Sequence, residues 1–330
     1  MSNEVPPPIR VLQMLMGMWV AQMTAAAARF GVADQIAQGV TSSDELARAV
    51  EADPTALYRL LRACATVGLF VETEPKVFAN TPLGECLRTG VPGSVREFLI
   101  AETAPGHWLP WGRLYDAVKS GRSFANDVLG MDAWEYYAKN HDEALTFARG
   151  MGNLSALVAQ DVVRLYDPSP FALIVDVGGS QGVLLNGLLN IAPNARGILF
   201  DRPEIIADVV PSERVKVVGG DFFDEIPAGG DLYLLKSILH DWPDDRCDAI
   251  LRNVHRAARD GAHLLVVETI LPEAPEPSPV TFMDLNMLVM LGGRERKVAE
   301  YGGLLRSAGF EMVRVIPTGG MFGLIEARKL

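Results

Sequence analysis

Cysteine and basic side chains are both scarce in this chain of 330 residues. Its 3 cysteines are far apart and form no CxxC pair, so we expect no disulfide framework and a reducing, cytoplasmic location. The 30 Lys and Arg residues against 41 Asp and Glu residues leave a net charge of −11. Because nucleic acids and anionic membranes are bound through clustered cations, neither is an expected partner.

An uninterrupted membrane-spanning stretch is also missing. Residues 11–28 are rich in apolar side chains, but Gln13, Gln22 and Thr24 interrupt them, so we interpret this segment as a buried helix. The first residues are acidic and rich in proline, whereas a secretory signal begins with basic residues. The apolar content of 49% is sufficient for folded cores and excludes a disordered chain.

The chain changes character near residues 168–170. Before this point the pattern is almost wholly helical, and after it short β-branched runs alternate with amphipathic helices. That alternation is typical of a parallel α/β sheet with crossover helices. We therefore predict three parts: a small domain over residues 1–100, a helical region over 101–168, and an α/β domain over 169–330.

The first part has the outline of a winged helix, with helices followed by a hairpin at residues 69–78. Ser42 or Ser43 can cap one helix, and Pro54 opens the next. A winged helix raises the alternative of a DNA-binding regulator. Residues 41–90 hold seven acidic and five basic side chains, however, whereas a DNA-reading unit normally has a basic footprint. A helical dimerisation unit is the favoured interpretation.

A glycine-rich turn follows the first strand of the α/β part. The apolar run 171–177 predicts a buried strand, and Gly178, Gly179 and Gly182 precede an apolar helix. Against the dinucleotide pattern GxGxxG, Val177 occupies the place of the first glycine, which weakens an NAD interpretation. Since no Lys-Ser/Thr pair follows, a P-loop is excluded. The turn suits a ligand without a pyrophosphate.

The next two strands end in residues suited to a nucleoside. Asp201 ends the second strand and can accept hydrogen bonds from ribose hydroxyls, while Asp221 and Phe222 follow the third and can hold an adenine ring. The fourth strand runs to Lys236, and His240 follows it before a helix that begins at Asp244. Further strands at residues 263–268, 310–316 and 321–328 complete a predicted seven-stranded sheet.

The motifs in this order resemble the S-adenosylmethionine-dependent small-molecule O-methyltransferases, the caffeic-acid-type and bacterial polyketide and phenazine tailoring enzymes. The matching blocks are Val175-Asp176-Val177-Gly178-Gly179, Phe200-Asp201-x-Pro203, Gly219-Gly220-Asp221-Phe222, Leu239-His240-Asp241-Trp242, Glu268-x-x-Leu271-Pro272 and Gly292-Gly293-Arg294-Glu295-Arg296. The resemblance implies a Rossmann-like, seven-stranded class I methyltransferase domain preceded by an all-α, winged-helix dimerisation domain, and therefore a homodimer. The family loop reads Gly-Gly-Gly-x-Gly; with Ser180 and Gln181 in its place here, we still expect the cofactor to bind.

The resemblance also implies site residues. Gly178, Asp201, Asp221, Phe222 and Lys236 would contact S-adenosyl-L-methionine, which leaves as S-adenosyl-L-homocysteine; His240 would be the general base, and Glu268 and Glu295 would orient its imidazole. A histidine suits this role because a phenol with a pKa near ~10 is a weak nucleophile until it loses its proton. The acids and histidines have no ligand spacing, so no metal is expected.

Aromatic and methionine side chains supply the expected acceptor pocket. Such side chains pack adaptably against flat ligands. The candidates are Trp108, Phe147, Met151, Met283, Asn286, Met287 and Met290. The predicted reaction is methyl transfer to a phenolic hydroxyl of an aromatic natural product. A nitrogen or carbon acceptor, or a member of the family that binds the cofactor without methylating, remain alternatives.

Overall fold

The computed structural model describes residues 5–330 and divides into two compact units. Unit 1 comprises Met1–Trp108 and Ala133–Leu154, and unit 2 comprises Leu109–Asp132 and Ser155–Leu330. Residues 1–4, on which part of the argument against a secretory signal rests, lie outside the described residues. The predicted boundaries at residues 100 and 168 stay predictions.

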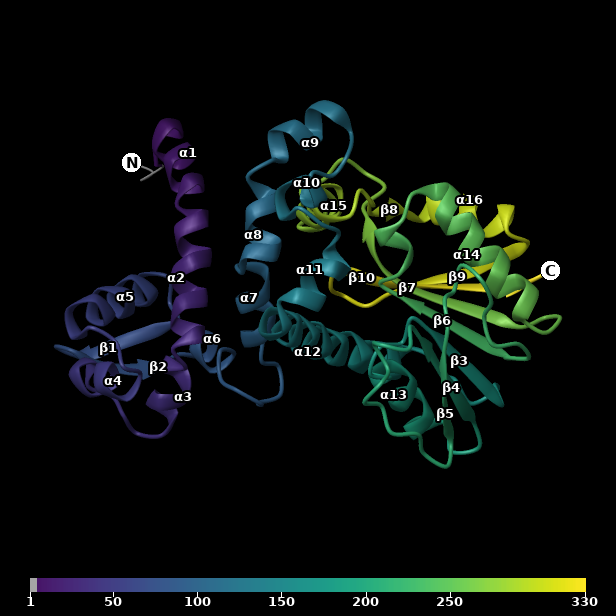
Figure 1. Ribbon diagram of the computed structural model, residues 1–330, viewed down its shortest axis with the longest axis horizontal. Coiled ribbons are helices and arrows are strands. Elements are labelled where there is room, and N and C mark those ends of the chain that lie inside the picture. The colour runs from purple at the N-terminus through teal and green to yellow at the C-terminus, as the bar shows by residue number, and fades with distance from the viewer. Residues whose placement is uncertain (1–4) are drawn as a thin grey trace. The chain divides into compact units, whose positions relative to one another are not determined.

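Unit 1 contains the predicted winged-helix outline (Figure 1). Its elements are α2 (Gly17–Arg29), α3 (Val32–Ala37), α4 (Ser43–Ala49), α5 (Pro54–Thr66), β1 (Phe70–Glu74), β2 (Val77–Asn80) and α6 (Pro82–Glu85). Helix α4 begins directly after Ser42, as predicted, but the Ser42 side chain makes no capping hydrogen bond. Helix α5 begins at Pro54, with the Asp53 side chain accepting a hydrogen bond from the N–H of Ala56. Buried Leu46, Phe70 and Phe78 hold the hairpin against these helices.

The predicted single buried helix over residues 11–28 is wrong. The segment forms α1 (Pro7–Leu15) and α2, with Met16 between them, and every residue of α1 is exposed. Val11 is 65% exposed and Met14 is 74% exposed. By length and composition alone, residues 7–29 could also cross a membrane. Among residues 5–330, none covers the apolar side chains of α1.

Four further helices contribute to unit 1: α7 (Arg96–Glu102), α8 (Pro105–Trp111), α11 (Ala133–Lys139) and α12 (His141–Leu165). An aromatic stack joins three of them. The Phe147 ring lies 5.0 Å from the His107 ring and 5.2 Å from the Tyr137 ring, measured between centroids. This stack uses one of the predicted acceptor residues, Phe147, in packing.

Unit 2 is built on a sheet with the strand order β5-β4-β3-β6-β7-β10-β9. The strands are β3 (Leu173–Val177), β4 (Arg196–Asp201), β5 (Val215–Gly219), β6 (Leu232–Lys236), β7 (His263–Leu271), β9 (Phe310–Pro317) and β10 (Phe322–Lys329). The first five run parallel, and β10 pairs antiparallel with both β7 and β9. The two-residue strand β8 (Arg296–Lys297) adds to the end of β7. The predicted seven-stranded α/β fold is confirmed.

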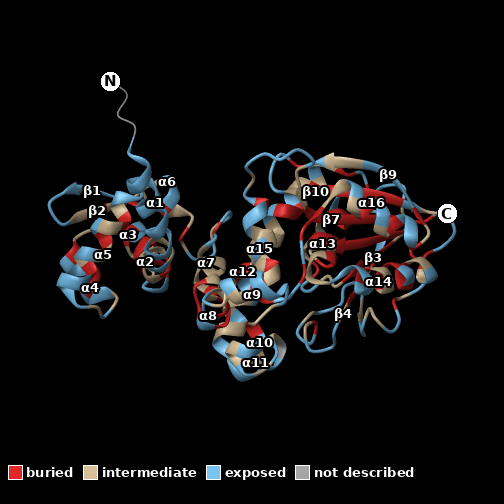
Figure 2. Cartoon of the chain, turned by 90° about the horizontal axis from the view of Figure 1, so that it is seen from above, coloured by how far each residue is buried: buried red, intermediate tan, exposed pale blue. Residues whose placement is uncertain are grey.

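Helices cover both faces of this sheet, and the strands are buried between them (Figure 2). Because side chains alternate along a strand, Val175 packs with α14 (Asp244–Ala257) and α16 (Val298–Ser307), while Ile174 packs with α13 (Val183–Ile191) and the end of α12. The remaining elements of unit 2 are α9 (Leu114–Ser120), α10 (Ala125–Leu129), η1 (Leu239–Asp241) and α15 (Val280–Met290). This two-sided burial fixes the positions of the strand ends.

Candidate active site

The candidate site lies where the parallel strands of unit 2 end. From β3 the chain proceeds to β4 and β5 on one side, and then returns to β6 and β7 on the other side. Ligands of open α/β sheets bind at such a reversal, outside the carboxyl ends of the strands. The predicted cofactor and base residues follow β3, β4, β5, β6 and lie within β7, so the fold brings them to one edge.

The turn after β3 needs its glycines. Gly178 has φ +70°, and a Cβ there would lie 2.5 Å from Cδ1 of Ile238. A Cβ on Gly179 would lie 2.6 Å from the carboxyl carbon of Asp176. Ser180 has φ +51°, a left-handed conformation that few residues other than glycine adopt. Ser180 therefore occupies a backbone position that would suit glycine.

Asp201 and Asp221 organise the adjoining loops. The Asp201 carboxylate accepts hydrogen bonds from the N–H of Ser180 at 2.8 Å and from that of Arg202 at 2.7 Å. Asp221 accepts from the N–H of Phe223 at 2.8 Å. Each carboxylate oxygen still has a lone pair free to accept from a ligand hydroxyl. Burial raises the pKa of Asp201, which marks a site that water reaches only partly.

The Phe222 ring belongs to an aromatic group at the same edge. Its centroid lies 4.8 Å from that of Phe223 and 6.3 Å from that of Trp242, both in edge-to-face geometry. The side-chain amide of Asn253 donates to the carbonyl oxygens of Phe222 and Phe223 at 2.8 and 2.9 Å. Asn253, which the sequence did not single out, thus holds the backbone that carries the predicted adenine-binding ring.

Asp176 is buried near the end of β3, and Lys236, the last residue of the neighbouring β6, is partly exposed. Burial raises the pKa of Asp176 to about 7, and burial also lowers the pKa of Lys236 despite the nearby Asp176 and Glu268 carboxylates. Among residues 5–330, Oδ2 of Asp176 has no hydrogen-bond partner. A buried acceptor without a partner is costly, so a ligand donor beside it would be favourable.

These features fit S-adenosylmethionine. Asp201 and Asp221 lie at this edge, and buried Asp176 lies two residues before Gly178 in β3. Carboxylates suit a ligand with a sulfonium, an ammonium group and ribose hydroxyls, and they would repel a pyrophosphate. The bound cofactor supplies the activated methyl group. The residues present therefore match the predicted cofactor.

His240 lies in η1, between the end of β6 and α14, and is surrounded by carboxylates. Its Nδ1 is 3.0 Å from Oε1 of Glu295 and 3.6 Å from Oε2 of Glu268. The fold brings these three predicted residues together. Glu268 lies within β7 and accepts from the N–H groups of Ile238 and Leu239, so it also holds the turn that carries His240. An Nδ1–H donated to Glu295 leaves Nε2 with the basic lone pair.

The charge around His240 makes it a stronger base than a free histidine. Burial lowers the pKa of the imidazole, but Glu268, Asp241 and Glu295 outweigh burial and raise it to about 10. Oδ1 of Asp241 lies 3.4 Å from Nε2 of His240. A base of this strength matches the pKa near ~10 of a phenol, but it is mostly protonated at neutral pH.

The group also has a geometry that a metal ion could use. One ligand atom from each of His240, Glu268 and Glu295 lies within 4.8 Å of the other two. Sequence spacing did not indicate this grouping, because the three residues come from separate elements. The expected absence of a metal stays a prediction, and an experiment is given for it below.

Two carboxylates around the site were not predicted as site residues. Asp241 follows His240 directly and faces its Nε2. Oδ1 of Asp284, in α15, accepts from the N–H of Glu295 at 2.9 Å and so fixes the residue that binds Nδ1. Adjacency to His240 could have indicated Asp241, whereas nothing in the sequence links Asp284 to the site.

The predicted acceptor residues are divided between the units. Trp108, Phe147 and Met151 belong to unit 1, and Met283, Asn286, Met287 and Met290 belong to unit 2. Within unit 2, Oδ1 of Asn286 accepts from Nε1 of Trp111 at 2.9 Å. Met287 and Met290 are already buried, at 7% and 9% exposure. Their contact with an acceptor stays a prediction.

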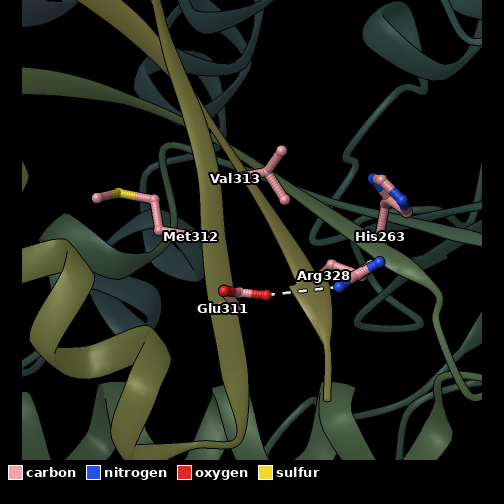
Figure 3. A pocket seen from close by; sticks show the side chains of 5 residues that line it. All are labelled: His263, Glu311, Met312, Val313 and Arg328. Carbon is pink, nitrogen blue, oxygen red and sulfur yellow. Dashed lines mark hydrogen bonds and ion pairs between the residues drawn. The ribbon is translucent and has the colours of Figure 1, made fainter.

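A separate hollow lies at the other end of β7 and is not this site. It has a volume of about 390 Å³ and is lined by His263, Glu311, Met312, Val313 and Arg328 (Figure 3). His263 is the first residue of β7 and Glu268 is the sixth, which separates them by about 16 Å along a strand. The hollow borders the exposed edge strand β9, where Glu311 pairs with Arg328.

Comparison with known proteins identifies the family. Residues 111–311 match the O-methyltransferase domain, and residues 12–90 match the O-methyltransferase dimerisation domain. The phenazine O-methyltransferase of Lysobacter antibioticus is 39% identical over 336 residues, covering 100% of this chain and 98% of that protein. The 8-amino-8-demethylriboflavin N,N-dimethyltransferase of Streptomyces davaonensis is 32% identical over 330 residues, covering 97% and 94%.

A solved structure agrees with these relatives. Human N-acetylserotonin methyltransferase, crystallised in complex with S-adenosylmethionine, aligns with a TM-score of 0.92 at 30% identity, covering 100% of this chain and 99% of that one. The predicted fold, cofactor and enzyme class are therefore confirmed. The chain belongs to the family of S-adenosylmethionine-dependent O-methyltransferases with an amino-terminal dimerisation domain.

Proposed function

We propose that the enzyme methylates a phenolic hydroxyl of an aromatic small molecule, with His240 as the general base. The observation that carries this proposal is the contact between Nδ1 of His240 and buried Glu295, because it directs the basic Nε2 away from that carboxylate. Methyl transfer is an in-line displacement at the sulfonium carbon, so alignment of the acceptor oxygen contributes to the rate along with proton removal. Glu268 and Glu295 orient the imidazole and stabilise its protonated form.

The test of this function is product formation. The purified enzyme is incubated with S-adenosylmethionine and a panel of phenols, quinones, phenazines and matched aryl amines, and products are followed by mass spectrometry. A CH₂ gain on a hydroxyl supports the proposal. Methylation confined to amines would replace it with an N-methyltransferase, an alternative favoured by the similarity to the Streptomyces davaonensis dimethyltransferase. Cofactor binding without any methylation would indicate a non-methylating member.

We also propose that Gly178, Asp201, Asp221, Phe222 and Lys236 contact the cofactor. Substitution of Asp201 by Asn keeps its size and one acceptor oxygen but removes the charge. Calorimetric titration with S-adenosylhomocysteine should show binding weakened by about tenfold, which corresponds to one lost charge-assisted hydrogen bond. Asp224→Asn, in the same region but exposed, is the matched control. Equal affinity of Asp201→Asn and wild type would remove Asp201 from the cofactor site.

The acceptor contacts are tested in the same assay. Phe147 and Met151 of unit 1 and Met283 of unit 2 are each replaced by Ala. Loss of an acceptor contact should raise the KM for the aromatic substrate and leave the KM for S-adenosylmethionine unchanged. A residue whose substitution changes neither value is not part of the acceptor site.

The exposed apolar surface of α1 and α2 supports a homodimer. Val11, Met14 and Trp19 are all more than half exposed, and the matching family domain is a dimerisation domain. Sedimentation should give a dimer for the wild type and a monomer for Met14→Glu. Association of the wild type with lipid vesicles would instead indicate a membrane surface. Binding to duplex DNA at physiological salt would support the regulator alternative.

A further inference from the structure

Arg296 is the largest fully buried side chain of the described residues, at 0% exposure. It follows Glu295 directly, yet it points at the backbone that carries His240. Its Nη1 donates to the carbonyl oxygen of Leu239 at 2.8 Å, and its Nη2 donates to that of Trp242 at 2.8 Å. The guanidinium therefore spans the two peptide groups on either side of the turn formed by His240 and Asp241.

Asp244 supplies the counter-charge. Its Oδ1 accepts from Nε and Nη2 of Arg296 at 3.0 and 2.8 Å, and its Oδ2 accepts from Nη2 of exposed Arg294 at 2.7 Å. Asp244 is the first residue of α14, where the sequence predicted a helix to begin. Because only the guanidinium has a planar fork of donors, Lys could not reach two carbonyls and a carboxylate at once.

The same short segment contacts His240 at two further points. The N–H of Arg294 donates to the carbonyl oxygen of His240 at 2.9 Å, and a Cβ on Gly293 would lie 2.1 Å from that oxygen. Glu295 then binds Nδ1 of the imidazole. Residues 293–296 thus fix the main chain and the ring of His240 together, relative to one another.

We propose that Arg296 is a positioning residue for the methyl transfer, acting through the turn 239–242 and not by touching substrate or cofactor. The hydrogen bonds of the guanidinium to Leu239, Trp242 and Asp244 hold the turn so that the imidazole stays against Glu295 with its Nε2 toward the acceptor. A displacement of about 1 Å at a reacting group can lower a rate by ~10²-fold. The inference rests on the proposed role of His240.

The test replaces Arg296 by Lys, which keeps the charge but loses the fork. We expect kcat to fall by about 10- to 100-fold while the KM for S-adenosylmethionine stays within about threefold, because the glycine turn and Asp201 are untouched. The rising limb of kcat/KM against pH should also move to lower pH, since a loosened Glu295 contact stabilises the imidazolium less. Arg252→Lys, in α14 but away from the turn, is the matched control; its exposed pair with Asp248 should matter less than twofold in kcat.

A purely structural role for Arg296 predicts a different result. Assayed well below its melting temperature, Arg296→Lys would then show wild-type kcat and an unmoved pH limb, and this outcome overturns the proposal. If Arg296→Lys does not fold, Asp244→Asn serves instead, because it keeps an acceptor oxygen but weakens the hold on the guanidinium. It should lower kcat and move the limb in the same direction, and wild-type values again overturn the proposal. If His240→Ala lowers kcat as expected but Arg296→Lys does not, the role of Arg296 is overturned and the proposed function remains supported.

Discussion

Unit 2 contains two histidines beside buried glutamates, and the two pairs differ in how their carboxylates are satisfied. Nδ1 of His240 lies 3.0 Å from Glu295, and Nδ1 of His263 lies 2.8 Å from Glu326. Glu295 is 2% exposed and Glu326 is 4% exposed. By distance and burial alone the pairs are nearly equivalent, although they lie at opposite ends of the sheet.

The difference lies in the other hydrogen-bond donors. Glu326 also accepts from the hydroxyl of Tyr166 at 2.9 Å and from Nε of Arg314 at 2.6 Å, so donors surround it. Around His240, Oε2 of Glu268 and of Glu295 have no hydrogen-bond partner within residues 5–330. An excess of carboxylate is what raises the basicity of His240. A histidine–glutamate pair whose carboxylate makes all its hydrogen bonds stabilises the fold. A histidine beside carboxylates that lack donors has a shifted pKa and can act in proton transfer.

The largest expected contrast comes from removing each ring. His240→Ala should lower kcat by on the order of 10²-fold or more, because general base catalysis is lost, while the Kd for S-adenosylhomocysteine is kept. His263→Ala, the matched variant at the other end of β7, should keep kcat within about twofold. Single-turnover methylation checks both. Equal rates for wild type and His240→Ala would sink the base assignment.

The dependence of kcat/KM on pH should report the effect of the carboxylates around His240 on its pKa. Since the pKa of His240 is raised to about 10, its basic form grows as pH rises, and kcat/KM should increase from neutral pH into the alkaline range. Glu295→Gln removes one of the charges that favour the imidazolium, so the limb should move to lower pH by about one unit. A wild-type limb near 6.5 would show that the carboxylates do not raise the pKa.

The strands and the cofactor edge could be read from the sequence because local signals mark them. The second strand, predicted to end at Asp201, is observed as Arg196–Asp201, and the glycine turn follows β3 as expected. His240 and Glu295 lie 55 residues apart, so only the family resemblance connected them. Their contact depends on β6, β7 and the loop before α16 meeting in space, which no local pattern records.

The burial of Arg296 and of helix α1 was not predicted correctly, because burial depends on residues that are distant in the sequence. Arg294 and Arg296 alternate with glutamate in a short charged run, yet Arg294 has a side chain 46% exposed and that of Arg296 is fully buried. Arg296 is buried because it donates to the carbonyl oxygens of Leu239 and Trp242, which are distant in the sequence. The apolar residues of α1 were interpreted as part of a buried helix, but all of α1 is exposed, because burial depends on what packs against a helix and not on its own sequence.

A smaller effect, on stability, is expected at the satisfied pair. Burial favours the neutral form of Glu326, but hydrogen bonds from Arg314, Tyr166 and His263 outweigh it and lower the pKa. The resulting stability is present above the unfolded pKa of about 4.3 and is lost as pH falls through the folded value. Glu326→Gln should unfold more easily at pH 7 by about 1–3 kcal/mol, with a flatter acid limb and unchanged kcat. Glu311→Gln, on the exposed edge strand, is the control and should match wild type.

The smallest expected effect is that of a chelator. It distinguishes a general base from a metal site at His240, Glu268 and Glu295. A metal ligand must offer a lone pair, but Nε2 of His240 faces Oδ1 of Asp241 at 3.4 Å. With Nδ1 also engaged by Glu295, we expect dialysis against EDTA to leave kcat within about twofold of the untreated enzyme. Loss of activity that zinc or magnesium restores would contradict this. It would mean that His240, Glu268 and Glu295 bind an ion, and that the unsatisfied carboxylate oxygens are ligands and not the source of a strong base.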